Sequence, residues 1–247
     1  MYLTIQGIVL RVTDYNDKDA LLTMLTRRHG RLTVKARGLR RKNSPLIAPC
    51  QLLAYGEFTL FEYRGQYTIN EAQSIELFTP LRRDLTKLSL GTYFAQVSEV
   101  LSQEDMPNPE LQSLLLNCLY MLSEQKRPVR MLKVIYELRS MTLAGYMPDV
   151  LACAGCGKYE GGDFYLDPVE GRLLCADCAE KARHITNLDN GALYALRHIC
   201  LAEDKKLFGF KISPESLKEL SRTSEQYTLA HLEHGLKSLD FLKSVLE

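Results

Sequence analysis

Four cysteines in two pairs are the residues whose types and spacing point most directly to chemistry. Cys153 and Cys156 form one Cys-x-x-Cys motif, and Cys175 and Cys178 form a second motif after eighteen intervening residues. Each motif presents two sulfurs on one side of a tight turn, and four thiolates are a ligand set that suits tetrahedral zinc. The separation between the motifs lies within the range expected for zinc sites. We therefore expect one structural Zn²⁺ ion, held by all four cysteines.

Other uses of these cysteines stay open at this point. A redox Cys-x-x-Cys motif normally occurs once, at the start of a helix, whereas here the motif occurs twice. Disulfides are a second alternative, although no secretory signal precedes the motifs. A catalytic zinc keeps one coordination position open, and four cysteines would close it. For the same reason His184, six residues after Cys178, is expected to be a surface residue and not a ligand.

A run of basic residues is the second informative feature. Eight cations fall within sixteen residues, and no acidic residue lies between Asp19 and Glu57, although the net charge of the chain is only +1. Such a concentration of positive charge favours contact with the phosphates of nucleic acid. We expect a DNA-binding surface made by Arg27, Arg28, Arg31, Lys35, Arg37, Arg40, Arg41 and Lys42.

Two alternatives to DNA binding remain for the basic segment. It could be a solvated charged loop, or the loop of a zinc-containing adaptor that binds an acidic protein partner. Neighbouring aromatic residues could stack on nucleic-acid bases, but core packing of a small barrel is the favoured reading for them. These aromatic residues are Tyr55, Phe58, Phe61, Tyr63 and Tyr67.

The secondary structure that must position these residues is expected to change from strands to helices near residue 78. Residues 1–78 show five short strand-like segments separated by turns, with no long helix, which is typical of a small barrel such as the OB-fold. An SH3-like barrel would give a similar pattern. The expected strands cover about 5–10, 20–26, 32–36, 52–63 and 67–75.

Residues 79–247 read as a helical domain with the cysteine motifs inserted in it. Apolar residues recur at helical spacing, and a hairpin of 164–166 and 172–174 is expected to bring the two motifs together. The zinc finger that these motifs form should span 151–182. A β-barrel followed by a helical domain makes the chain an α+β protein. His231 and His234 would form a surface pair on the last helix. Helices are expected to begin near Thr79, Asn108, Pro128, Asp189, Ser213 and Ser224.

Several functions have no supporting motif in the sequence. There is no nucleotide-binding phosphate loop, no nucleophile elbow, no His-Glu-x-x-His motif and no EF-hand loop, so we expect no enzymatic activity. No apolar run approaches the ~20 residues that span a bilayer. We expect a cytoplasmic protein with reduced thiols, in which Cys50, Cys118 and Cys200 are small buried residues.

The order of these parts resembles the RecO family of bacterial DNA repair and recombination mediators. The resemblance covers nearly the whole chain. It implies an N-terminal OB-fold, a helical domain and an inserted zinc finger, with binding and annealing of single-stranded DNA, binding of double-stranded DNA, and nucleoid association. It also implies partnership with RecR, and help in loading RecA onto DNA coated by single-strand binding protein. The matching segments are 17–22, 26–30, 36–41, 145–148, 153–157 and 174–178.

The resemblance also implies which residues make contacts. The basic loop 37–42 is the best candidate for contact with DNA. The acidic tail of single-strand binding protein would bind the helical domain, where Arg130, Lys133 and Arg139 are candidates. Some members of the family lack the four cysteines, so zinc is not required for the shared activity.

Overall fold

The chain folds as two compact units. The structure, a computed structural model, describes residues 1–232 and 235–246. One unit comprises Met1–Lys126 with Leu236–Glu247, and the other comprises Arg127–Gly235. This grouping differs from a single helical domain over 79–247, because the first two long helices and the last one belong to the unit that contains the barrel.

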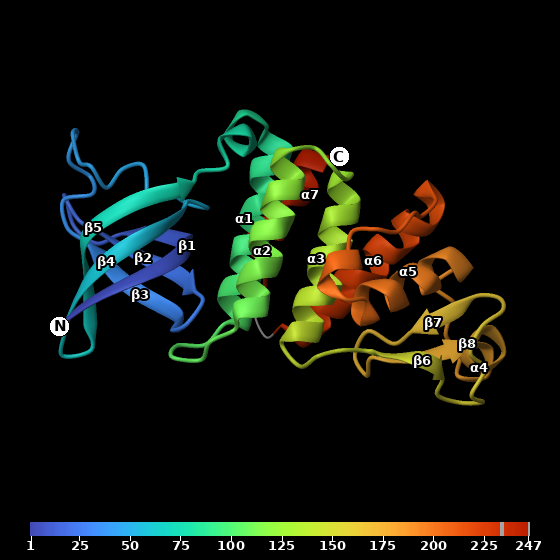
Figure 1. The fold of residues 1–247 in the computed structure, drawn as a ribbon. Helices are drawn as coiled ribbons and strands as arrows, with labels where there is room; N and C mark the ends of the chain where they lie inside the picture. Colours follow the sequence, from blue (N-terminus) through green and yellow to red (C-terminus); the bar gives the residue numbers. More distant parts are fainter. Residues whose placement is uncertain (233–234, 247) are drawn as a thin grey trace. The chain divides into compact units, whose positions relative to one another are not determined.

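Five strands form a closed barrel in the order β1-β2-β3-β5-β4 (Figure 1). Neighbouring strands are antiparallel, except that β3 and β5 pair in parallel through Val34 and Tyr67. The predicted five-stranded barrel is confirmed, and its strand order is that of an OB-fold. The strands are β1 (Tyr2–Asp14), β2 (Ala20–Thr26), β3 (Gly30–Ala36), β4 (Tyr55–Tyr63) and β5 (Gln66–Glu76).

Alternating apolar residues build the barrel core. Leu32, Val34 and Ala36 point inward from β3 and pack with Phe58 and Leu60 of β4, all of them buried. This alternation is the period of a strand with one face inside and one face in solvent. Strand β4 begins later than the expected residue 52, because the segment before it is a turn with a left-handed residue at position 53.

Four helical segments complete the barrel unit, namely η1 (Thr79–Arg83), α1 (Leu85–Leu101), α2 (Pro109–Ser123) and α7 (Lys237–Leu246). The helix expected from Thr79 is only a short 3-10 turn, and α1 begins afresh where Asp84 accepts a hydrogen bond from the Lys87 amide. Asn108 caps α2 as expected. Helices α1 and α7 lie side by side, and α1 covers part of β1 and β2.

The second unit combines helices with a small sheet. Strands β6 (Asp149–Cys153), β8 (Arg172–Cys175) and β7 (Phe164–Leu166) form this sheet in that order. The β7–β8 hairpin was expected, whereas β6 was not. Helix α3 packs against α5 and α6. The helical segments of this unit are α3 (Val129–Leu143), α4 (Ala176–Lys181), α5 (Asn190–Leu201), η2 (Asp204–Lys206) and α6 (Pro214–His231).

The predicted helix boundaries near the end of the chain were wrong. One helix, α6, runs without a break from Pro214 to His231, with Ser213 as its N-cap, and a separate helix begins at Lys237. His231 lies in the last turn of α6, where its Nδ1 atom contacts the Tyr227 carbonyl. His234 lies outside the described residues. Among the helices that are described, none combines the length and the apolar character that a membrane crossing requires.

Candidate metal centre and nucleic-acid interface

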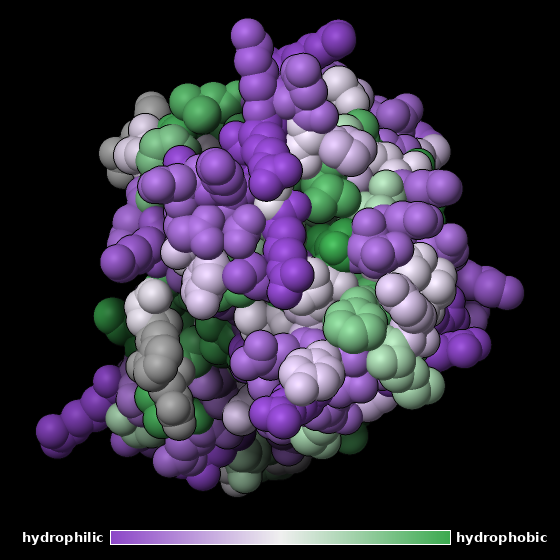
Figure 2. Space-filling view, turned by 90° about the vertical axis from the view of Figure 1, so that its left-hand side faces the viewer, coloured by the Kyte–Doolittle hydropathy of each residue, from purple (hydrophilic) through white to green (hydrophobic). Residues whose placement is uncertain are grey.

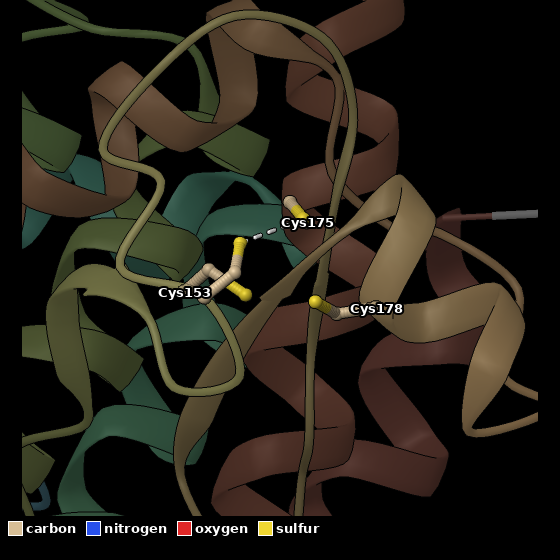
Figure 3. A group of neighbouring side chains, drawn as sticks. Cys153, Cys175 and Cys178 are labelled. Atoms are coloured by element: carbon tan, nitrogen blue, oxygen red, sulfur yellow. Dashed lines mark hydrogen bonds between the residues drawn. The ribbon is translucent and has the colours of Figure 1, made fainter.

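The side chains of the four cysteines come together at one place, and Figure 3 shows three of them, Cys153, Cys175 and Cys178, with labels. Their sulfur atoms all lie within 4.8 Å of one another, and the Sγ atoms of Cys156 and Cys175 are 3.6 Å apart. Tetrahedral zinc with bonds of about 2.3 Å needs sulfurs roughly 3.8 Å apart. The donor set therefore fits one metal ion, and the predicted cysteine cluster is confirmed as a group able to hold one.

Local backbone geometry explains how two short motifs can meet. Cys153 ends β6 and Cys175 ends β8, so that the sheet brings them together, and Cys178 follows on α4. Gly157 adopts a left-handed φ of 75°, which glycine reaches without strain. Gly155 lies against the other motif, since a Cβ atom there would stand 3.0 Å from the Cys178 sulfur. Two glycines therefore allow the first turn to close around the site.

The backbone around Cys153 favours its thiolate form. Burial raises the pKa of this thiol, but backbone hydrogen bonds from Cys175, Gly155 and Cys156 outweigh that effect and lower the pKa to about 6. The thiolate is the form that binds a metal. Within the same cluster the effect is opposite for Cys178, because hydrogen bonds with the other three cysteine side chains raise its pKa to about 12. Burial raises the pKa of the isolated Cys50 to about 12. It and the other two isolated cysteines are buried as expected.

Arg197 ties the finger to helix α5, a role that the sequence did not reveal. Its guanidinium donates hydrogen bonds to the carbonyls of Val150 at 2.7 Å, Leu151 at 2.9 Å and Tyr159 at 2.5 Å. It also lies over the Tyr159 ring, 4.1 Å from the centroid. The available signal was a charged residue on the apolar face of a predicted helix. His184 is exposed, as expected, and stacks on Tyr165.

The barrel divides the eight predicted DNA-binding cations into two groups. Strands β2 and β3 pair from Thr26 opposite Gly30 to Ala20 opposite Ala36. Arg27 and Arg28 lie at one end of this hairpin and residues 37–42 follow its other end. Six residue steps at about 3.3 Å separate the two ends by roughly 20 Å. The eight cations therefore do not form one continuous phosphate-binding surface.

Three of these cations already have partners within the barrel unit. Arg31 donates to the Glu99 carbonyl at 2.8 Å. Lys35 lies 3.3 Å from an Asp19 carboxylate oxygen, and Arg40 lies 3.2 Å from a carboxylate oxygen of Asp14. The acidic partners precede the basic run in the sequence and fold back against it.

The other five cations are exposed and have no ion pair within residues 1–232 and 235–246; they are Arg27, Arg28, Arg37, Arg41 and Lys42. The last three lie at the start of a turn-rich segment, residues 37–54, and belong to its first part, the basic loop 37–42. Asp19 holds its start by accepting a hydrogen bond from the Gly38 amide at 2.9 Å. Figure 2 shows one face of the chain, on which hydrophilic residues dominate and hydrophobic ones form smaller patches.

The aromatic residues near the barrel split between core and surface. Phe58 is fully buried, and Tyr67 packs against the core. Phe61 and Tyr63 are exposed by 41% and 59%, which leaves them available for stacking. Tyr2, which was not among the expected residues, lies beside Phe61 with ring centroids 5.4 Å apart.

The helical residues expected to bind a partner lie in different environments. Lys133 is buried between Glu137 at 2.7 Å and Glu225 at 3.0 Å, so its charge is not at the surface. Arg139 bonds the carbonyl of Cys200 at 3.0 Å and pairs with Asp204. Arg130 is exposed.

Matches to known proteins cover nearly the whole chain. Residues 1–78 match the family model "Recombination protein O N terminal", and residues 82–240 match "Recombination protein O C terminal". A "DNA repair protein RecO" of Acetivibrio thermocellus is 32% identical over 99% of this chain and 97% of its own length. The protein of the same description from Symbiobacterium thermophilum is 30% identical over 98% of this chain and 96% of its own length. One from Alkaliphilus metalliredigens is 28% identical over 99% of this chain and all of its own length.

Proposed function

The chain belongs to the recombination protein O (RecO) family of DNA repair proteins, and on that basis we propose that it is a non-enzymatic, DNA-binding recombination mediator. It binds single- and double-stranded DNA and anneals complementary single strands. Together with RecR it helps to load RecA onto DNA coated by single-strand binding protein. The observation that carries the DNA-binding part is a set of exposed cations on the barrel unit, which form no ion pair with any residue that the structure describes.

The basic loop is the main DNA contact in this proposal. Arg37, Arg41 and Lys42 are exposed, follow one strand of a small barrel, and are free to meet phosphates. Exposed aromatic rings at another part of the barrel, Phe61 and Tyr63, supply faces on which bases can stack. Phosphate contacts of this kind give affinity that depends on salt and not on sequence.

Replacing Arg37, Arg41 and Lys42 together by alanine tests the role of the basic loop. We expect the affinity for single-stranded DNA to fall at least tenfold. The logarithm of affinity falls with the logarithm of salt by about 0.7 per phosphate contact in single strands, so the loss of three contacts should make the slope less steep by about 2. Fluorescence anisotropy with a labelled oligothymidine over a salt series measures both quantities.

The matched control removes the same charge elsewhere. Lys205, Lys206 and Lys211 are exposed residues of the other compact unit, and their replacement by alanine should leave the slope unchanged. Equal loss in both triple variants would show that only net charge matters. Unchanged DNA affinity in the basic-loop variant, with binding to an acidic protein lost instead, would favour the adaptor alternative.

We also propose that the metal is one structural Zn²⁺ ion. Four thiolates form a closed ligand set, with no position left for a substrate or a reactive water. When bound, the ion would link β6, β8 and α4 through Cys153, Cys156, Cys175 and Cys178. Elemental analysis of the purified protein with X-ray absorption at the zinc edge should give one zinc with four sulfur neighbours. Oxygen or nitrogen in that shell would contradict this proposal.

The partner contacts of the mediator role can be tested separately. Arg130 is the exposed cation among the three candidates for the acidic tail of single-strand binding protein. Arg130→Ala should weaken annealing of oligonucleotides coated with that protein while leaving annealing of bare oligonucleotides unchanged. An equal effect on both substrates would place Arg130 in DNA contact instead. Addition of RecR should permit RecA loading on the coated DNA, which a RecA filament assay reports.

A further inference from the structure

The first part of strand β1 has a neighbour on one side only. β1 pairs with β4 from Tyr2 to Ile8, but its pairing with β2 starts at Gly7. Residues 2–6 therefore have no strand on the β2 side within the described residues. We call this the β1 edge. An unpaired strand edge is a template for a further strand.

The hydrogen-bond pattern identifies the backbone groups at this edge. Met1 exchanges both of its backbone bonds with Glu62, and Val9 exchanges both of its bonds with residues 53 and 54. The register between β1 and β4 is regular from Tyr2 to Ile8. In an antiparallel pair these bonds alternate along the strand, so odd-numbered residues face β4. Thr4 and Gln6 consequently direct their N–H and C=O groups to the β1 edge.

A pocket of about 580 Å³ lies along the β1 edge. Leu3, Thr4, Ile5 and Gln6 line one side, and Arg27 and Arg28 reach it from the turn after β2. The turn is held in place, since the Thr26 hydroxyl donates to the Gly30 carbonyl at 2.9 Å and accepts from the His29 amide at 3.1 Å.

The charges in the pocket favour an anion. Arg27 and Arg28 are exposed and have no ion pair among the described residues, while Glu57 is the single acidic residue of the lining. From these observations we propose that the β1 edge binds an acidic, extended peptide segment of a partner protein. The segment adds to the barrel as a short strand beside residues 2–6, with its acidic side chains on Arg27 and Arg28. Five residues give an edge of roughly 16 Å.

The backbone groups at the edge favour a peptide over a nucleic acid. Thr4 and Gln6 present carbonyl acceptors as well as N–H donors, and a peptide strand supplies a partner for each. A phosphodiester chain has no donors, so it would leave both carbonyls facing anions. A second copy of this chain is also a poor occupant, because its own residues 2–6 carry no acidic side chain to meet the arginines.

The probe for this proposal is a fluorescein-labelled peptide of three glutamate–valine repeats, measured by fluorescence anisotropy with the full chain. We expect saturable binding, and at least tenfold weaker binding of a lysine–valine peptide. Two further peptides are N-methylated at all glutamates or at all valines. A strand bonds its neighbour through alternate residues, so one of these should lose binding and the other should keep it.

Two variants of the chain complete the test. Gln6→Pro removes a donor from the β1 edge and leaves the bonds of the odd-numbered residues to β4 intact. It should weaken peptide binding at least tenfold, as should Arg27→Ala combined with Arg28→Ala. The control is Arg41→Ala with Lys42→Ala, at the other end of the β2–β3 hairpin, which should bind the peptide normally. Circular dichroism melting establishes that each variant is folded.

The outcomes against the proposal are distinct. Equal binding of the two N-methylated peptides to the unmodified chain overturns strand addition, even if Gln6→Pro fails to fold. Shifts of the Thr4 and Gln6 amide signals with oligothymidine, and none with the peptide, would make the edge a DNA site. Self-association that disappears in Gln6→Pro would make it an interface between two copies. None of these results depends on the basic loop, so the proposed DNA contact of that loop is tested independently of the β1 edge.

Discussion

At the scale of single residues, the metal centre depends on a glycine that has no side chain as much as on the four cysteine sulfurs. Gly155 has no side chain where a Cβ atom would stand 3.0 Å from the Cys178 sulfur, and 3.3 Å from its Cβ. The two cysteine motifs can approach only because this space is empty. A larger residue would force one ligand away from the position that a tetrahedral ion needs.

Gly155→Val should therefore weaken metal binding roughly tenfold or more, with all four ligands still present. Competition with a chromogenic zinc chelator measures the change. Ala154→Val is the control, because this neighbouring position in the same turn is exposed. Equal affinities in the two variants would show that the close approach at Gly155 is unimportant.

Asp19 makes the start of the basic loop sensitive to acid. A backbone hydrogen bond from Gly38 is the main cause that lowers the pKa of this carboxyl below its ordinary value of 3.8, with further contributions from Asn16 and Lys35. Since the pKa is lower in the folded state, the stabilisation is fully present above the unfolded value and is lost as the pH falls through the folded value.

We expect the Gly38 amide to lose protection from hydrogen exchange as the pH is lowered through that range, because the protonated carboxyl is a weaker acceptor. Exchange measured by NMR reports this amide directly. Asp19→Asn keeps an oxygen acceptor but removes the titrating group, so its profile should be flat after correction for intrinsic exchange. An acid-sensitive Gly38 amide in that variant would point to a different group.

Patterns local in sequence were predictable, and contacts between distant segments were not. The four cysteines are recognisable because each pair fixes its own turn. The ion pairs of Lys35 and Arg40 depend on how β1 and β2 turn back, and the burial of Lys133 depends on Glu225, 92 residues away. The charges of these residues therefore predicted an exposed basic surface, but in the fold some of them form ion pairs within the chain.

At the scale of elements, one arginine attaches the finger to helix α5. Arg197 of α5 bonds three carbonyls that belong to β6 and to the segment after the first cysteine motif. Hydrogen bonds from a charged group to buried partners are the stronger ones in proteins. The orientation of the metal centre on the helices thus rests on a residue outside the cysteine motifs.

Arg197→Met keeps most of the apolar length but removes these bonds, and should destabilise the second unit by about 3 kcal/mol. Urea unfolding followed by circular dichroism measures the loss, and faster amide exchange in β6 should accompany it. The comparison variant is Arg172→Met, whose exposed pair with Glu170 should contribute at most about 1 kcal/mol. Similar losses in both variants would remove the special role of Arg197.

The wrong prediction for the last helices also has a cause at this scale. Leu232, Leu236 and Leu239 are spaced by four and three residues, as on one helix face. In the structure Leu232 follows the end of α6, which belongs to the second unit. Leu239 lies in α7, which packs on α1 in the barrel unit. Apolar periodicity shows which residues are buried, but the spacing continues across the break and does not show which core receives them.

At the scale of the whole molecule, the metal centre and the proposed DNA contacts lie in different compact units. A structural zinc can contribute on the order of 10 kcal/mol to the folding of a small site. Any such contribution should be confined to the unit that contains the cysteines.

Chelation of the metal, or Cys153→Ser, should therefore lower the melting temperature of one unfolding transition and leave the other in place. Differential scanning calorimetry with and without a chelator separates the two. Affinity for oligothymidine should change less than twofold under the same conditions. Loss of DNA binding before any loss of stability would mean that the finger itself contacts DNA.

The division of the chain into units has a consequence for its synthesis. The barrel unit is interrupted, because α7 returns to it only after the whole second unit, residues 127–235, has been made. The ribosome therefore releases all elements of the second unit while the face of α1 that receives α7 is still uncovered. The unit that comes first in the chain is therefore the unit that is completed last, and a nascent chain that ends before residue 236 still lacks the helix that packs on α1.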